Sequence, residues 1–352
     1  MLFMSYFREN IEKLTAYEPG FQPKSTDVVK LNTNENPYPA SPKVFEAIKN
    51  LTSENLRRYP QPFADSFREA AAEVLGFKSE NIICTNGGDE LLNMAIRAIC
   101  DENRPLAYPT PTYSLYPVLA QTQNCPAVEI PFDDEFNLPA KLASADAALT
   151  ILCNPNAPSG TFIPKQEIAQ LAQEIKGVLL IDEAYVDFSE DNCLDLVKKF
   201  ENVIILRTMS KGYSLAGLRF GFGIANENLI NGLDKVKDSY NTDAIAIAAA
   251  TAAIKDQTHF KQNVEKVKAE RKRLTAELTA LGFEVMPSQS NFVFAKSVKT
   301  RAIDVYEKLK ENNIYVRYWA YPDIKDKLRI SIGTPEQNDK LIGELKKITA
   351  QG

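Results

Sequence analysis

The sequence predicts an α/β protein with two domains. In the large domain a mostly parallel seven-stranded sheet lies between helices, and the smaller domain is of the α+β type. Two observations lead to this prediction. Between about residues 80 and 225, seven short runs of apolar and β-branched residues alternate with helical patterns, as in βαβ units. After about residue 255 the pattern changes to one long charged helix, followed by strands and helices.

The seven runs are predicted to be the strands of the large domain. Several carry apolar residues on both parities, which is expected where helices cover both faces of a parallel sheet. The runs lie at 82–85, 105–108, 127–132, 148–153, 177–182, 202–208 and 219–225.

Helix signals fit between these runs. Ser41 followed by Pro42 predicts a helix start, with the serine as N-cap and the proline in the first turn. Pro164 opens a further helical pattern, whose apolar residues repeat on one face until Gly177 ends it.

The C-terminal part has a different character. A long amphipathic helix is predicted over 256–281, and further helices are predicted near 299–312 and 335–350. The strand-like runs there are FEVM, NFVFA, IYVRYW and LRISIG. We divide the chain into an N-terminal arm (1–30) that packs with the small domain, a large domain (31–245) and a small domain (246–352).

Composition excludes several classes of function. The 41 basic and 46 acidic residues give a net charge of −5 and are spread along the chain, so no nucleic-acid partner is expected. The five cysteines form no C-x-x-C pair and His259 is the single histidine, which argues against a disulfide framework and a metal site. No secretory leader is visible, and no apolar run reaches the roughly 20 residues that cross a membrane. We therefore expect a cytoplasmic protein without a membrane partner.

Polar residues follow four of the predicted strands at the point where each strand ends. Ligands of open parallel sheets bind beyond the carboxyl ends of the strands, so these positions are the first candidates for a site. They are Gly87 and Gly88 after 82–85, Asn154 after 148–153, Asp182 at the end of 177–182, and Ser210 and Lys211 after 202–208.

Each of these positions has a functional and an ordinary interpretation. Gly87 and Gly88 could bring backbone N–H groups to a phosphate at a helix start or simply form a tight turn, and the sequence there lacks both G-x-x-x-x-G-K-[ST] and G-x-G-x-x-G. Asp182 could pair with a protonated ring nitrogen or cap a helix. Lys211 could have a lowered pKa and form a Schiff base, or be a solvated surface residue.

Taken in order, the polar residues form a recognisable series. Asn154-Pro155, Asp182-x-x-Tyr185, Thr208-x-Ser210-Lys211 and Arg219 together resemble the fold-type I pyridoxal-phosphate aminotransferases in residue type and spacing. Five further segments are similar to the histidinol-phosphate aminotransferase family within that group: LNTNENPYP at 31–39, RYP at 58–60, TNGGDELL at 85–92, PTYSLY at 111–116 and LRISIGT at 328–334. The resemblance covers essentially the whole chain.

The resemblance implies pyridoxal 5'-phosphate as the cofactor and a homodimer as the assembly. Lys211 would carry the cofactor as a Schiff base and move a proton, and Asp182 would keep the ring nitrogen protonated. Asn154 and Tyr185 would donate hydrogen bonds to the phenolate oxygen, and Tyr113 would stack on the ring. The remaining cofactor contacts, mainly around the phosphate, would be Gly87, Gly88, Asp89, Thr208, Ser210, Arg219 and, from the neighbouring subunit, Tyr59.

The resemblance also implies a transamination in histidine biosynthesis, between glutamate and imidazole-acetol phosphate, that gives L-histidinol phosphate and 2-oxoglutarate. Arg329 aligns with the arginine that aminotransferases use for a substrate carboxylate, and its planar fork suits a phosphate as well. Arg317 would be a second cation for the phosphate, or a solvated strand-edge residue. Tyr17 and Asn36 complete the expected substrate contacts. Ala157 stands where relatives commonly have an asparagine, a change that we expect to leave the chemistry unaffected.

Three other functions stay open at this point. A threonine-phosphate decarboxylase would use the same lysine and phosphate pocket but release CO₂. An aromatic amino-acid aminotransferase would keep the cofactor residues and need Arg317 less. A non-catalytic relative is disfavoured by the intact Lys211 and Asp182.

Overall fold

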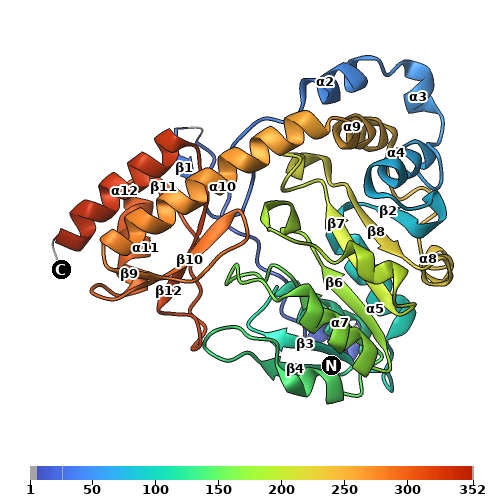
Figure 1. Cartoon of the computed structure of the whole chain (residues 1–352), viewed down its shortest axis with the longest axis horizontal. Helices are drawn as coiled ribbons and strands as arrows, with labels where there is room; N and C mark the ends of the chain where they lie inside the picture. Colours follow the sequence, from blue (N-terminus) through green and yellow to red (C-terminus); the bar gives the residue numbers. More distant parts are fainter. Residues whose placement is uncertain (1–5, 26, 351–352) are drawn as a thin grey trace.

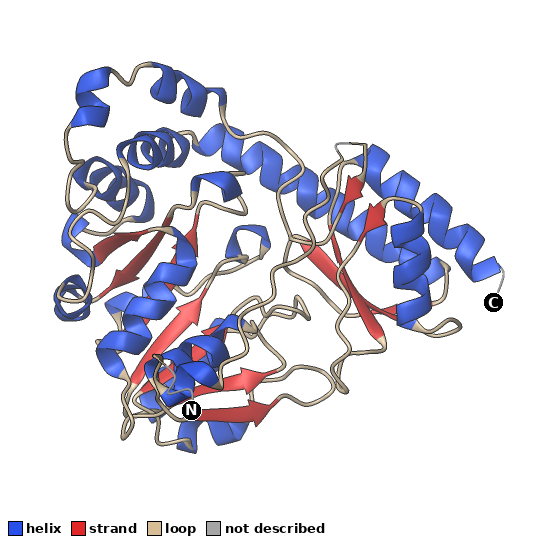
Figure 2. Cartoon of the chain, turned by 180° about the vertical axis from the view of Figure 1, so that it is seen from behind, coloured by secondary structure: helices blue, strands red, loops and turns tan. Residues whose placement is uncertain are grey.

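The computed structural model describes residues 6–25 and 27–350 and shows two units joined by a long helix (Figure 1). The larger unit contains a seven-stranded sheet between helices, and the smaller unit contains a three-stranded and a two-stranded sheet packed with helices (Figure 2). This architecture agrees with the predicted α/β class.

The central sheet has the strand order β2-β8-β7-β6-β5-β3-β4. β8 runs antiparallel to both of its neighbours, whereas the other pairs are parallel. Each predicted run forms one strand: β2 (Ile82–Thr85), β3 (Leu106–Thr110), β4 (Ala127–Pro131), β5 (Leu149–Cys153), β6 (Val178–Asp182), β7 (Val203–Thr208) and β8 (Gly221–Ala225). The carboxyl ends of the three central strands meet at one edge, where Asp182 is paired with Cys153 on one side and with Leu206 on the other.

The helices of the larger unit begin and end close to their sequence signals. Ser41 accepts a hydrogen bond from the backbone N–H of Lys43 at 3.1 Å, which confirms it as an N-cap. The helix predicted after Pro164 ends before Gly177, because Ile175 is already extended. The helices are α1 (Glu9–Glu12), α2 (Pro42–Lys49), α3 (Ser53–Arg57), α4 (Asp65–Leu75), α5 (Gly87–Ile99), α6 (Leu115–Gln123), α7 (Lys165–Glu174), α8 (Glu227–Asp234) and α9 (Ala244–Lys255), with short 3₁₀ turns at 79–81, 140–144, 186–188, 194–198 and 216–218.

Two hydrophobic cores lie on the two faces of the central sheet. β6 shows the division: Leu179 and Ile181 pack with α2, α4, α7 and α9, whereas Leu180 packs with α5, α6 and α8. All three side chains are fully buried, and burial of each stabilises the fold by about 1.5–3 kcal/mol. Because both faces are covered, the polar end of β6 is the point at which the sheet can contact a ligand.

The smaller unit holds the end of the N-terminal arm as well as the C-terminal part of the chain, whereas α1 at the start of the arm packs on α6 of the larger unit, where Asn10 donates to the carbonyl of Gln121 at 2.7 Å. The prediction that the arm packs with the small domain is therefore correct only for its end. β1 (Val29–Lys30) pairs in parallel with β11, with Val29 opposite Ile314. The predicted strand over 314–319 is regular only in its first two residues; beyond them, Arg317 and Arg329 exchange backbone hydrogen bonds of 2.9 and 3.0 Å. The elements are α10 (Gln257–Ala280), β9 (Phe283–Val285), β10 (Phe292–Ser297), α11 (Ala302–Glu311), β11 (Ile314–Tyr315), β12 (Lys327–Ser331) and α12 (Pro335–Ala350), with the antiparallel order β12-β10-β9.

Helix α9 packs with the larger unit. It contacts α2 and α4 and contributes to the core between them, and α10 begins directly after it, beyond Asp256. We therefore propose that the boundary between the large and the small domain lies at Asp256 rather than at residue 245. Within 6–25 and 27–350, every helix is too short or too polar to span a membrane.

The start of α5 lies directly against the start of β8. A Cβ atom on Gly221 would lie 2.6 Å from the carbonyl carbon of Gly87 and 2.7 Å from the nitrogen of Gly88. Glycine at 221 is therefore required by the close approach of two backbones.

We expect Gly221→Ala to lower the free energy of unfolding by about 1–3 kcal/mol, because the new methyl group pushes the start of α5 away from the sheet. Gly217→Ala is the matched control, since nothing lies within 4 Å of its Cβ position. Urea unfolding of both variants measures the difference, and equal midpoints would contradict the packing argument.

Candidate active site

A cavity of about 770 Å³ lies where the carboxyl edge of the central sheet faces the smaller unit. Both units and the N-terminal segment line it. Of the residues predicted for a site, the following line this cavity: Tyr17, Gly88, Asp89, Tyr113, Asp182, Tyr185, Thr208, Ser210, Lys211, Arg219, Arg317 and Arg329.

Asp182 is a buried carboxylate at the end of β6. One oxygen accepts a hydrogen bond from the Tyr116 hydroxyl at 2.7 Å, and the other accepts from the backbone N–H of Ala184 at 3.0 Å. Burial raises the pKa of Asp182 to about 6, against these two hydrogen bonds. No lysine or arginine of the described chain forms an ion pair with it, so the carboxylate is suited to a cation that a ligand brings.

Lys211 projects into the same cavity from the loop after β7. Its Nζ donates to the carbonyl oxygen of Thr33 at 3.2 Å and lies 5.5 Å from the centre of the Tyr185 ring. Burial and, as the second cause, the charge of Arg329 together lower the pKa of Lys211 to about 8. An amine with this pKa is partly neutral near physiological pH and can act as a nucleophile or a base.

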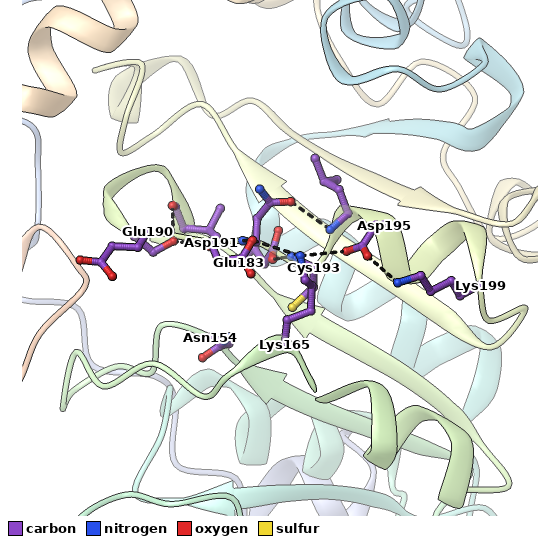
Figure 3. A network of polar contacts seen from close by, with 12 residues as sticks. Asn154, Lys165, Glu183, Glu190, Asp191, Cys193, Asp195 and Lys199 are labelled. Carbon is purple, nitrogen blue, oxygen red and sulfur yellow. Dashed lines mark hydrogen bonds and ion pairs between the residues drawn. The ribbon is translucent and has the colours of Figure 1, made fainter. Parts of the chain in front are cut away.

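A network of buried charges connects the segments that carry these two groups. The Glu183 carboxylate accepts from Arg207 Nε at 2.7 Å and from the backbone N–H of Cys193 at 2.6 Å. Beside it, a partly exposed ion pair joins Lys165 of α7 to Asp191 at 3.1 Å (Figure 3). Glu183 follows β6 and Arg207 belongs to β7, so this ion pair fixes one strand end relative to the next.

The start of α5 and the end of β7 with its following loop carry groups that suit an anion. Gly88 lies in the first turn of α5, where backbone N–H groups point outward, and the hydroxyls of Thr208 and Ser210 lie beside it in the cavity wall. Arg219 contacts Ser210 Oγ at 3.4 Å and Asp89 Oδ2 at 3.3 Å. A phosphate at this position would meet one guanidinium, two hydroxyls and a helix N-terminus.

Two tyrosines cover the cavity on the side of α6. Tyr113 donates a hydrogen bond to Asp89 at 3.2 Å, and its ring meets that of Tyr116 edge to face at 5.6 Å. Tyr17, from the N-terminal segment, packs against Tyr113 at 5.9 Å. The Tyr113 ring is therefore held on both sides and offers an aromatic surface to a flat ligand.

The smaller unit contributes two arginines without a carboxylate partner among the described residues. Arg329 donates to the carbonyl of Asn32 at 3.1 Å, its Nε is buried with no partner, and burial together with Arg317 lowers its pKa. Arg317 donates to the carbonyl of Glu18 at 3.2 Å. The two guanidinium groups lie 5.2 and 5.1 Å from the ring centre of Trp319. An anionic ligand group is the partner that they lack.

Asn154, predicted to contact a ligand, instead turns into the protein. It is fully buried, its oxygen accepts from the backbone N–H of Ile163 at 2.8 Å, and its amide donates to the carbonyl of the same residue at 3.1 Å. Ala157 lines the cavity in this stretch. This part of the wall therefore carries the methyl group of Ala157 rather than the amide expected from Asn154, and the expectation that Ala157 leaves the chemistry unaffected stays a prediction.

Three other predicted residues lie outside the cavity wall. Asn36 donates to the backbone carbonyls of Lys211 and Gly212 at 3.1 and 3.2 Å, so it holds the lysine loop. Gly87 lies behind Arg219, whose Nη2 is 2.6 Å from its Cβ position. Tyr59 is 80% exposed and stacks on Tyr240 at 4.4 Å.

The sequence interpretation did not single out Tyr116, Trp319 and Asn34 as site residues. Tyr116 and Asn34 lie inside segments that carried the resemblance, PTYSLY and LNTNENPYP, and the aromatic and amide types were the available signal. Trp319 is the single tryptophan and stands two residues after Arg317.

Known proteins are similar to this chain over nearly its whole length. Residues 26–345 match the family described as aminotransferase class I and II. Histidinol-phosphate aminotransferase 1 of Trichormus variabilis is 51% identical over 98% of this chain and 99% of its own length, and histidinol-phosphate aminotransferase of Rhodopirellula baltica is 45% identical over 95% and 93%. The crystal structure of histidinol-phosphate aminotransferase from Sinorhizobium meliloti in complex with pyridoxal-5'-phosphate has the same fold, with a TM-score of 0.90, 24% identity and coverage of 99% of this chain and 98% of that one. The chain therefore belongs to the aminotransferases of class I and II.

Proposed function

We propose that this protein uses pyridoxal 5'-phosphate to exchange an amino group between glutamate and imidazole-acetol phosphate, giving L-histidinol phosphate in histidine biosynthesis. One observation carries the proposal: Arg317 and Arg329, which lack carboxylate partners in the described chain, face the cavity that holds the buried Lys211 and Asp182. Relatives of the same name at 51% and 45% identity support it.

The residues of the cavity fit this cofactor. Asp182 is a buried carboxylate without a cation, as a protonated pyridine nitrogen requires, and Lys211 is a desolvated amine. The start of α5 with Thr208, Ser210 and Arg219 suits a phosphate. When bound, the cofactor supplies an aldehyde for an amine and a cationic ring that withdraws electrons from the carbon to be deprotonated.

Each residue then has a task that its environment supports. Lys211 Nζ, with a pKa near 8, would hold the cofactor and, once free as an amine, would take a proton from the α-carbon of the substrate. Asp182 would pair as a carboxylate with the ring nitrogen. Tyr185 would donate a hydrogen bond to the phenolate oxygen, a role that falls to it alone because Asn154 turns inward. Tyr113 and Asn36 position the ring and the lysine loop.

The two arginines would let one site bind the carboxylate of glutamate and the phosphate of the second substrate in turn. A single guanidinium binds two oxygens of a carboxylate, whereas a phosphate dianion can use two cations. Arg329 is the more buried site for either group, and Arg317 adds the second charge for the phosphate. Tyr17 borders the same end of the cavity.

A homodimer and a cytoplasmic location are part of the same proposal. Tyr59 lies on the surface with Tyr240 stacked on it, and both rings are exposed in the single chain, as is Phe63 nearby. A neighbouring subunit that covers this patch would receive Tyr59 at its cofactor phosphate. All five cysteines are unpaired, which suits a reducing compartment.

We expect Arg317→Ala to raise KM for histidinol phosphate about 10- to 100-fold, because one charged hydrogen-bonding group to the dianion is lost. KM for glutamate should change by about threefold or less. Steady-state kinetics of both half-reactions measure the ratio. Lys325→Ala, which removes an exposed positive charge of the same segment outside the cavity wall, is the control.

Equal losses for both substrates would remove Arg317 from this role. A wild-type protein that exchanges amino groups with phenylalanine and ignores histidinol phosphate would be an aromatic aminotransferase. Release of CO₂ from threonine phosphate would identify a decarboxylase.

The lowered pKa of Lys211 predicts a pH dependence in the cofactor-free protein. Reductive methylation of Lys211 by formaldehyde should rise with pH and level off above about pH 8, because only the neutral amine reacts. Peptide mapping by mass spectrometry measures it, with Lys176, whose side chain is 90% exposed, as the internal reference. Arg329→Gln should move the midpoint upward, since the Arg329 charge is the second cause of the shift. A midpoint above about pH 10 in the wild type contradicts the burial of the amine.

Subunit complementation tests the position of Tyr59. Tyr59→Ala should weaken cofactor binding about tenfold through the loss of a hydrogen bond to the phosphate. Mixed dimers with Lys211→Ala should regain tight-binding sites, because the chain with the intact lysine then receives Tyr59 from its neighbour. Mixed dimers that bind the cofactor as weakly as Tyr59→Ala alone would show that Tyr59 acts within its own chain or not at all.

A further inference from the structure

The segment 31–36 passes between the two units and carries an asparagine whose role is not explained by direct contact with a ligand. Asn34 is 1% exposed and adopts a left-handed backbone conformation, with φ of +57°. Asn291, which is fully buried, donates its amide to the carbonyl oxygen of Asn34 at 2.9 Å. The residue is therefore held from the smaller unit while its side chain points toward the larger one.

The orientation of the Asn34 amide follows from its partners. Ser331 Oγ accepts a hydrogen bond from the backbone N–H of Asn34 at 2.9 Å, so the single hydroxyl proton of Ser331 is free to point elsewhere. That proton is donated to Asn34 Oδ1, also at 2.9 Å. With its oxygen used in this way, Asn34 can turn only its N–H₂ group to Tyr185, whose hydroxyl oxygen lies 3.0 Å from Nδ2.

The hydrogen bond from Asn34 determines the direction in which the Tyr185 hydroxyl can donate its proton. Its oxygen accepts from Asn34, and Asn34 Nδ2 cannot accept a hydrogen bond in return. The hydroxyl proton of Tyr185 must therefore point away from Asn34, and Tyr185 lines the cavity.

We propose that Asn34 is a positioning residue for the reaction: as a fixed N–H donor held by Ser331, it makes Tyr185 a hydrogen-bond donor into the cavity. The inference rests on the proposed function, in which that donor meets the phenolate oxygen of the cofactor. The absence of an amide on the neighbouring wall, where Asn154 turns inward and Ala157 lines the cavity, leaves this task to Tyr185.

Burial keeps the Tyr185 hydroxyl protonated near neutral pH. Burial raises the pKa of Tyr185 to about 12, and Asp182 and Cys153, from β6 and β5, act in the same direction. Arg329 from β12 and the hydrogen bond of Asn34 act against this shift. Lys211 Nζ lies 5.5 Å from the ring. Tyr185 is thus an O–H donor over the working range of pH, and its direction is the property that Asn34 controls.

Three variants separate orientation from structure. Asn34→Asp keeps the shape but replaces the donor with an acceptor, so the Tyr185 proton should turn toward residue 34. Asn34→Gly removes the side chain at a φ that glycine adopts freely. Asn338→Ala is the matched control: Asn338 is a fully buried amide of the smaller unit that bonds Gly333 and Glu270 outside the cavity.

The first readout is the pH midpoint of the visible absorbance of the protein with bound cofactor. Loss of a donor to the phenolate oxygen destabilises its negative charge, so we expect Asn34→Asp to raise the midpoint by about one unit or more, in the direction of Tyr185→Phe. Asn34→Gly should raise it less. Asn338→Ala should lower the melting temperature and leave the midpoint unchanged. An unchanged midpoint in both Asn34 variants overturns the proposal.

The second readout needs no cofactor. In apoprotein labelled with ¹³Cζ-tyrosine, the resonance that disappears in Tyr185→Phe belongs to Tyr185. Asn34→Asp should move it downfield, because a phenol that donates to a carboxylate gains phenolate character, and Asn338→Ala should leave it in place. A resonance that stays in place in Asn34→Asp counts against the inference, whereas a wild-type protein that binds no cofactor refutes the proposed function alone.

Discussion

The structure depends on keeping two ionisable groups out of water at the same sheet edge. Asp182 ends one central strand, Lys211 follows the next, and neither forms an ion pair within residues 6–25 and 27–350. Burial raises the pKa of Asp182 to about 6 and contributes most to lowering that of Lys211 to about 8, so both pKa values lie close to neutral pH. A ligand that carries a cationic ring nitrogen and an aldehyde relieves both costs at once, so the fold binds this cofactor by the groups that it otherwise leaves unsatisfied.

Parts of the chain that are far apart in sequence meet at this edge. Residues 32–34 line the cavity. The segment 31–36 contributes the Thr33 carbonyl to Lys211, the Asn34 amide to Tyr185 and the Asn36 amide to the lysine loop. The smaller unit holds that segment through β1 and β11 and through Ser331. The positions of Lys211 and Tyr185 in the larger unit therefore depend on how the smaller unit packs against it.

Substrate selection and cofactor binding use opposite electrostatic arrangements in one cavity. On the side of the sheet, the hydrogen-bonded carboxylate of Asp182 can pair with a cation of a ligand. On the side of the smaller unit, Arg317 and Arg329 lie near Trp319 and can bind an anion. This polarity orders any substrate that bears an acidic group at one end and an amine at the other. The positive charge of Arg329 also adds to burial in lowering the pKa of Lys211.

Apolar periodicity and capping are local signals, so the sequence alone predicts the strands of the central sheet, the N-cap of α2 and the positions of Asp182 and Lys211 at strand ends. The direction in which each amide points depends on the folded chain. Asn154 bonds Ile163, Asn36 bonds the lysine loop and Asn34 bonds Tyr185, and each direction depends on which partner the folded chain brings within 3.2 Å. An amide can donate or accept in several directions at similar cost, so its neighbours, which are distant in sequence, settle its role.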